Sequence, residues 1–267
     1  MKDAVRQLPM RWRDGEWLAG DAPPSPQELP VAIVIDGMSQ AVLMATPHDL
    51  HDFAIGFALT EGMIASPKDV ASYETAQVSA RGMPAIEARL WLQPGLSVQL
   101  VERKRAMIGP VGCGLCGVDN IAAALPEIIP VDSDLTMAPA EIGKAMAALS
   151  DGQILRRATP AIHGAGFWDK ATALVREDVG RHNALDKLAG AMARQDLDGA
   201  RGAIVMSSRL SVDLVQKAAR IGAPILIGAS APTELALAWA EAAGITLIAR
   251  ARGQDFDLFT HPQRIAA

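Results

Sequence analysis

The chain has 267 residues, of which 50% are hydrophobic and 21% are charged, and its formal net charge is −5 at pH 7. This length and composition suit one or two globular domains, and the acidic balance argues against general nucleic-acid binding. The most apolar stretch, residues 221–249, is interrupted by prolines and glutamates, so no spanning helix or secretion signal is predicted. We therefore expect a cytoplasmic protein with no nucleic-acid or membrane partner.

Residues 1–125 are expected to form a smaller N-terminal α+β part. After a proline-rich arm over residues 1–30, two apolar runs flank Asp36-Gly37, a pair typical of a hairpin turn. Thr46-Pro47 has the pattern of an N-cap followed by proline in the first helical position, and Gly62 is placed to end that helix. Strands are predicted over residues 86–92 and 97–101, and a short helix over residues 121–125.

Both cysteines of the chain, Cys113 and Cys116, lie in one glycine-rich loop. Structural zinc normally needs four ligands, and histidines would have to supply the rest, so we predict no metal site. A thioredoxin-type motif would stand between the first strand and helix of a βαβ unit, whereas this loop lies in mid-chain. Residues 103–105, which are Arg-Lys-Arg, lie just upstream. Nearby cations lower the pKa of a thiol, so the loop suits a reactive thiolate.

Residues 126–267 have the rhythm of an α/β domain. Short apolar runs at 203–206, 224–227 and 246–249 alternate with segments of helical spacing at 212–221 and 234–243. This order predicts parallel strands with right-handed crossovers. Ligands of such sheets bind at the carboxyl ends of the strands, where this chain places Arg209, Arg250 and Arg252.

A second candidate ligand site follows a predicted strand at residues 171–175. Arg181 and His182 precede a predicted helix near Asn183, a place where cations and backbone N–H groups can hold phosphate. The alternative is a salt-bridge network of the charged residues in this segment, namely Glu177, Asp178, Arg181 and Lys187. In the same way, Arg209 either grips a diphosphate or caps the sheet, and His163 is either structural or part of the site.

Several motifs together carry a resemblance to a known family. They are Cys-Gly-Leu-Cys-Gly at 113–117, Glu-Asp-Val-Gly-Arg-His-Asn-Ala-Leu-Asp-Lys at 177–187, Ser-Ser-Arg at 207–209 and Thr-His-Pro-Gln-Arg at 260–264. In this order, over about residues 30–264, the chain resembles the formate dehydrogenase accessory sulfurtransferases, the FdhD family. The resemblance implies an α/β fold in which a cytidine-deaminase-like mixed sheet with flanking helices is joined to the smaller N-terminal part. It also implies a homodimer.

The resemblance further implies a function and residues for it. Such a protein takes sulfur as a persulfide from a cysteine desulfurase and passes it to the molybdenum bis-molybdopterin guanine dinucleotide cofactor that formate dehydrogenase requires. Cys113 matches the persulfide cysteine and Cys116 its partner, which either relays the sulfur or attacks the persulfide. The family's cofactor-binding stretch falls on Arg250, Ala251, Arg252, Gly253, Gln254 and Asp255, and we add His163, Arg181, His182 and Arg209 as candidate cofactor-binding residues.

Two departures and two alternatives accompany this interpretation. Asp255 stands where a basic residue would better suit a phosphate-bearing ligand, and Pro160 and Ala161 precede His163 where the family often has Thr-Gly-Gly. The alternative function is a chaperone that holds the molybdenum cofactor or a guanine nucleotide without sulfur transfer, its cysteines acting as a redox switch. A third is a thiol-disulfide oxidoreductase.

Overall fold

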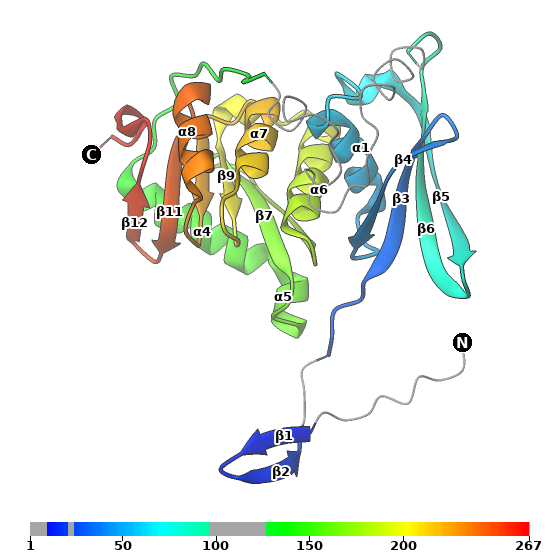
Figure 1. Cartoon of the computed structure of the whole chain (residues 1–267). Helices are drawn as coiled ribbons and strands as arrows, with labels where there is room; N and C mark the ends of the chain where they lie inside the picture. The colour runs from blue at the N-terminus through cyan, green and yellow to red at the C-terminus, as the bar shows by residue number, and fades with distance from the viewer. Residues whose placement is uncertain (1–9, 21–23, 97–126, 267) are drawn as a thin grey trace.

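The computed structural model of the chain describes residues 10–20, 24–96 and 127–266. Within them the backbone forms a two-stranded, a four-stranded and a six-stranded sheet (Figure 1). The predicted strand at 97–101, the predicted helix at 121–125, Cys113, Cys116 and the basic run at 103–105 lie outside the described residues. None of the helices in the described ranges is long and apolar enough to cross a membrane.

The six-stranded sheet has the order β12-β11-β10-β9-β7-β8 and lies wholly within the C-terminal half of the chain. Its strands are β7 (His163–Trp168), β8 (Ala173–Asp178), β9 (Ala203–Met206), β10 (Ile225–Gly228), β11 (Thr246–Arg252) and β12 (Asp255–Leu258). The predicted parallel pairing of β9, β10 and β11 is confirmed. Strands β7 and β8 on one side and β12 on the other add antiparallel pairs. The strand predicted at 171–175 corresponds to β8, whereas β7 and β12 were not predicted.

Helices cover both faces of this sheet (Figure 1). On one face lie α6 (Arg181–Arg194), α7 (Val212–Ile221) and α8 (Glu234–Ala243), and on the other lie α4 (Pro139–Gly152) and, beyond it, the short α5 (Ile154–Ala158). Successive strand residues point to opposite faces, so Ile204 and Met206 pack with α6 and α7 while Val205 packs with α4. Both faces are buried, which explains the continuous apolar runs.

The four-stranded sheet has the order β4-β3-β6-β5. Its strands are β3 (Leu29–Ile35), β4 (Met38–Ala45), β5 (Val70–Ala80) and β6 (Met83–Leu92), and α1 (Leu50–Thr60) packs between this sheet and α6. The predicted Asp36-Gly37 hairpin is confirmed, with φ of 48° and 76° at the two turn residues. The described ranges also contain three short 3-10 turns, η1 (Pro67–Asp69), η2 (Gly199–Arg201) and η3 (Pro262–Arg264).

The predicted start of the first helix was wrong. The helix begins at Leu50, and Asp49, with φ of 53°, is the N-cap. Thr46 is buried instead, where its hydroxyl accepts a hydrogen bond from Val179 N–H and its own N–H donates to Asp178. A tertiary contact with residues more than 130 positions away therefore took the place of a local cap.

The contact between α1 and α6 depends on two glycines. A Cβ atom at Gly56 would lie 1.7 Å from the carbonyl oxygen of Asp186, and one at Gly190 would lie 1.9 Å from that of Asp52. The two helix backbones can approach this closely only because neither glycine carries a side chain.

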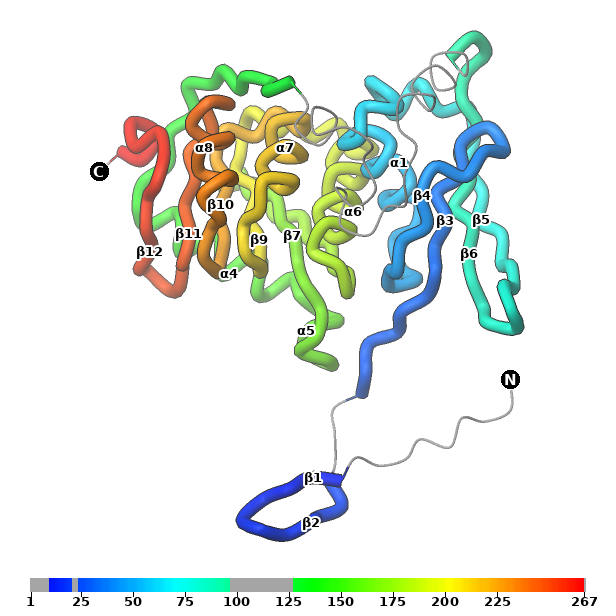
Figure 2. The backbone as a smooth tube through the Cα atoms, in the orientation of Figure 1, coloured from blue at the N-terminus to red at the C-terminus, as the bar shows by residue number. Residues whose placement is uncertain are grey.

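The arm at the N-terminus holds a short hairpin, β1 (Met10–Arg13) and β2 (Glu16–Ala19), with every residue of both strands exposed. Trp12 and Trp17 face each other across it with ring centroids 5.1 Å apart. In the tube trace this hairpin stands clear of both larger sheets (Figure 2), so it contributes nothing to the core.

Candidate functional site

The carboxyl ends of the parallel strands form one continuous edge with the start of β7 and the end of β8. Ser207, which follows β9, receives a hydrogen bond from Gly164 N–H at 2.8 Å and donates its own N–H to Gly164 O at 3.0 Å. In the antiparallel pairing of β7 with β8, the backbone of His163 lies opposite that of Asp178 at the end of β8. Antiparallel pairing of β7 therefore brings His163 to the edge where ligands of parallel sheets bind.

Two helices begin at this edge without a side-chain cap. Gly180 is the N-cap of α6 and Ser211 that of α7, and neither cap makes a side-chain hydrogen bond to its helix. The two starts lie close together, because His182 Nε2 is 3.5 Å from both Ser211 Oγ and Asp213 Oδ2. Uncapped N–H groups and the positive ends of helix dipoles make such a place suitable for an anion.

Positive side chains outnumber negative ones here. Arg181 carries a buried Nε atom with no hydrogen-bond partner among the described residues. Arg209 is exposed after β9 and forms no ion pair within the described part of the chain. Arg156 donates to Ile162 O at 3.0 Å and lies near enough to His163 to act on its charge. A surplus of arginine in an acidic protein points to a specific anionic ligand.

The histidines at the edge have different environments. Burial lowers the pKa of His163 below its ordinary value of 6.5, and the charges of Arg181 and Arg156 lower it further. His163 is therefore neutral at pH 7, and its buried Nδ1 atom has no partner among the described residues. Burial by itself would raise the pKa of Asp213, but the hydrogen bond and charge of His182 outweigh it and keep that pKa below its ordinary value. An ionised Asp213 thus orients His182.

The predicted stretch from Arg250 to Asp255 forms the β11–β12 hairpin at the far end of the same sheet. Arg250 N–H donates to Ser230 O at 3.3 Å, while its guanidinium pairs with Asp257 and lies 5.6 Å from the centre of the Phe259 ring. Ala251 is buried in the core, so only its backbone is available to a ligand.

The other predicted residues of this hairpin surround its turn. The backbone of Arg252 is the register partner of the Asp255 backbone in the neighbouring strand, and Gly253 turns the chain with φ of 59°. The Gln254 amide lies against Gly143 of α4. Arg252 is the exposed arginine of the stretch that has no ion pair among the described residues.

The alternative of a salt-bridge network is correct for part of the motif at 177–187. Asp178 and Lys187 form an ion pair at 2.7 Å in which both side chains are fully buried. Glu177, in contrast, accepts the backbone N–H groups of Leu155 and Arg156. Arg181 belongs to the edge described above and not to the network. The motif therefore serves both the interior and the site.

The sequence analysis missed Asp213 and Arg156, and it included Ser207 only as part of the Ser-Ser-Arg motif. Asp213 lies in the first turn of a predicted helix, where acidic residues are common. Its position therefore gave no reason to expect a contact with His182. Within the described residues, no group of three or more histidine, cysteine, aspartate or glutamate side chains could hold a metal ion.

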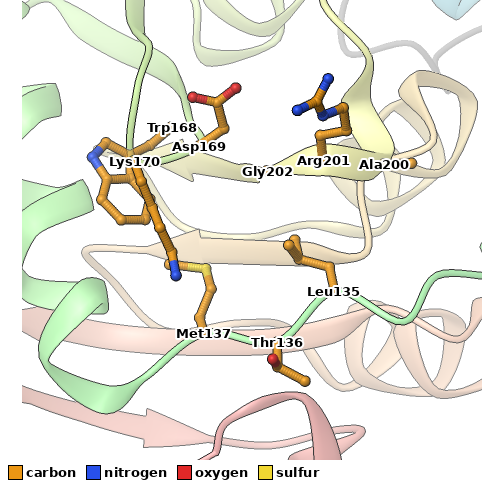
Figure 3. A pocket seen from close by; sticks show the side chains of 9 residues that line it. All are labelled: Leu135, Thr136, Met137, Trp168, Asp169, Lys170, Ala200, Arg201 and Gly202. Carbon is orange, nitrogen blue, oxygen red and sulfur yellow. The ribbon is translucent and has the colours of Figure 1, made fainter.

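A cavity of about 390 Å³ lies at the opposite ends of β7 and β9 (Figure 3). Trp168 and Met137 line it, and the chains of Lys170 and Arg201 lie on opposite sides of it (Figure 3). Lys170 is paired with Glu141 at 2.8 Å, and Asp169 also lines the cavity. Since these charges balance, the cavity lacks the positive surplus of the strand edge.

Comparison with known proteins identifies the family. The FdhD/NarQ family matches residues 26–266 of the chain. A sulfur carrier protein FdhD of Agrobacterium fabrum is 45% identical over 90% of this chain and 88% of its own length, and one of Bordetella bronchiseptica is 43% identical over 93% and 90%. The crystal structure of a formate dehydrogenase accessory protein from Desulfotalea psychrophila has a TM-score of 0.73 and 25% identity, covering 97% of this chain and 98% of that one. The chain belongs to the FdhD/NarQ family.

Proposed function

We propose that this protein is a sulfur carrier that serves the maturation of formate dehydrogenase. It takes sulfur from a cysteine desulfurase in the cytoplasm and delivers it to the molybdenum bis-molybdopterin guanine dinucleotide cofactor. The observation that carries the proposal is the strand edge where the uncapped start of α6, Arg181 and Arg209 lie with few opposing charges. Its relatives are named sulfur carrier proteins, and a cofactor with two diphosphates suits this edge.

The sulfur moves by thiol exchange. The Cys113 thiolate attacks the outer sulfur of the donor's persulfide, the sulfur–sulfur bond of the donor breaks, and the donor cysteine leaves as a thiolate. A new persulfide then stands on Cys113, with no net oxidation. Cys116 attacks the inner sulfur of that persulfide, so that a Cys113–Cys116 disulfide forms and the outer sulfur leaves as hydrosulfide for the cofactor. The two thiols supply the two electrons of this reduction.

The described residues hold the cargo. The first-turn N–H groups of α6 and the Arg181 guanidinium bind a diphosphate, and Arg209 and Arg252 bind further phosphate oxygens. Neutral His163 accepts or donates a hydrogen bond without adding charge. In the family's manner, we propose that two copies of the chain form a homodimer and that the six-stranded sheet is the cytidine-deaminase-like part.

The test is intact-protein mass spectrometry after incubation with a cysteine desulfurase and free cysteine. Wild type should gain the mass of one sulfur, which dithiothreitol removes, until Cys116 releases it as hydrosulfide and the mass falls to that of the disulfide form. Cys113→Ala should gain none, whereas Cys116→Ala should keep the persulfide because nothing resolves it. Absence of sulfur from every form, with a competent desulfurase, would refute the carrier function.

A second candidate function is a cofactor-holding chaperone without sulfur transfer. It is favoured by the uncapped starts of α6 and α7 at one strand edge, since such an edge can hold an anionic cofactor whether or not sulfur is transferred. Cys113→Ala separates the two functions, because a holding protein with this substitution would still activate formate dehydrogenase. A carrier would bind the cofactor and fail to activate the enzyme.

A further inference from the structure

The Asp178–Lys187 ion pair is the most deeply buried charged contact at the start of α6. Both side chains have no exposed surface, and Oδ2 and Nζ are 2.7 Å apart. A buried ion pair adds little stability compared with apolar residues of the same volume, because both ions lose their hydration. Its presence here therefore calls for an explanation other than stability.

The Asp178 carboxylate fastens the turn that leads into α6. Oδ1 accepts the N–H of Gly180 at 2.8 Å and the side-chain amide of Asn183 at 2.9 Å. Oδ2 accepts the N–H of Thr46 at 3.0 Å. Gly180 is the N-cap of α6, and Arg181 and His182 lie between it and Asn183. The carboxylate thus holds the Gly180 backbone before Arg181 and His182 and the Asn183 side chain after them.

Lys187 and Thr46 complete the arrangement from the other side. The Lys187 ammonium donates to Thr46 O at 2.9 Å and to Glu177 O at 3.4 Å. The Thr46 hydroxyl accepts the N–H of Val179 at 3.1 Å. Since Thr46 follows β4 directly, the bonds made by Thr46 tie the start of α6 to the four-stranded sheet.

We propose that Thr46, Asp178 and Lys187 are positioning residues that aim the first-turn N–H groups of α6 and Arg181 at the anionic cargo. They do not touch the cargo themselves. The inference rests on the proposed function in that the anion is a diphosphate of the cofactor. Its physical basis is that an anion site loses affinity when its donors must be reorganised on binding.

A second buried ion pair on the same helix supplies a matched control. Asp186 and Lys217 lie 2.8 Å apart, and Asp186 also accepts from the Thr60 hydroxyl at 2.6 Å. This pair joins α6 to α7 and to the end of α1, and it makes no hydrogen bond to residues 178–183. Loss of either pair removes one buried ion pair, and loss of Lys217 also removes its 2.8 Å pair with the half-exposed Glu61, but only the Asp178–Lys187 pair holds the start of α6.

The experiment compares Asp178→Asn/Lys187→Met with Asp186→Asn/Lys217→Met, both checked for cooperative thermal unfolding. GDP and inorganic pyrophosphate are the probes, and titration calorimetry gives their affinities. The first double variant should bind each about ten-fold more weakly than wild type, and the control should stay within about two-fold. Equal affinity of both double variants, whether at the wild-type value or below it, would overturn the inference.

A second measurement decides the inference independently of ligand binding. The Ala184 N–H donates to Gly180 O at 2.9 Å, the first hydrogen bond of α6. Its hydrogen exchange should be about ten-fold faster in Asp178→Asn/Lys187→Met and unchanged in the control, since local opening follows the loss of anchoring bonds. If wild type binds neither probe, the cofactor assignment fails. The exchange rates then still show whether the start of α6 depends on this pair.

Discussion

Gly190→Ala tests the close packing of α1 and α6. The new Cβ would lie 1.9 Å from the backbone oxygen of Asp52, whereas ordinary contact begins at 3.4 Å. The helices would therefore have to separate by about 1.5 Å, because a backbone oxygen in a helix cannot rotate away. Helix propensity by itself favours alanine over glycine by roughly 1 kcal/mol. If propensity dominates, the variant should be more stable than wild type, whereas the close packing predicts that it is less stable.

We expect an overpacking cost of about 3 kcal/mol, which the helix propensity of alanine reduces to a net loss of about 2 kcal/mol. For a chain of this size that net loss lowers the melting temperature by about 4–8 °C. Urea unfolding followed by circular dichroism and tryptophan fluorescence measures it. Ala147→Gly, at an exposed position of α4, is the control and should cost only about 1 kcal/mol. A Gly190→Ala protein as stable as wild type, or more stable, would refute the packing argument.

Three further predictions follow from the charges. The pKa of His163 is near 6.5 in the unfolded chain and lower in the folded protein. The free energy of unfolding should therefore fall as the pH falls from about 7 to about 5. In urea titrations, His163→Gln should make this pH dependence weaker. Asp52→Asn removes a carboxylate that is 4% exposed and shared by two arginines, and it should lower the free energy of unfolding by about 3 kcal/mol. Glu74→Gln, in an exposed ion pair, should lower it by less than about 1 kcal/mol. Equal losses for the two variants would contradict this prediction. Arg181→Gln should weaken GDP binding about ten-fold or more. Arg250→Gln should weaken it less, because Asp257 already neutralises Arg250 in wild type. Calorimetry that ranks the two variants in the opposite order would refute the proposed anion site at the start of α6.

Much of the large sheet could be predicted because its signals are local. The apolar runs of β9, β10 and β11 and the glycines at the ends of α7 and α8 coincide with the observed elements. Side-chain periodicity and positive φ at a terminal glycine depend on neighbours within a few residues. The same holds for the Asp36-Gly37 turn.

The candidate site could be predicted only in part. Arg181, His182 and Arg209 were recognised because each follows or begins an element with a clear pattern. Strands β7 and β8 were not predicted with their observed ends, so the pairing that sets His163 beside Asp178 could not be foreseen. The role of Asp213 depends on the approach of α6 and α7, which no spacing in the chain encodes.

The sequence by itself determined the family, the α/β pattern of the C-terminal half and the candidate residues for the proposed sulfur transfer and anion binding. Those properties are local patterns and motifs, and they survive without coordinates. Only the tertiary structure decided that Thr46 holds the start of α6 instead of capping α1, and that Asp178 and Lys187 turn inward while Arg181 stays at the edge. The physical reason is that a buried charge must be paired or hydrogen-bonded, and the partners available to it are set by tertiary packing. That packing brings together residues more than a hundred positions apart in the sequence.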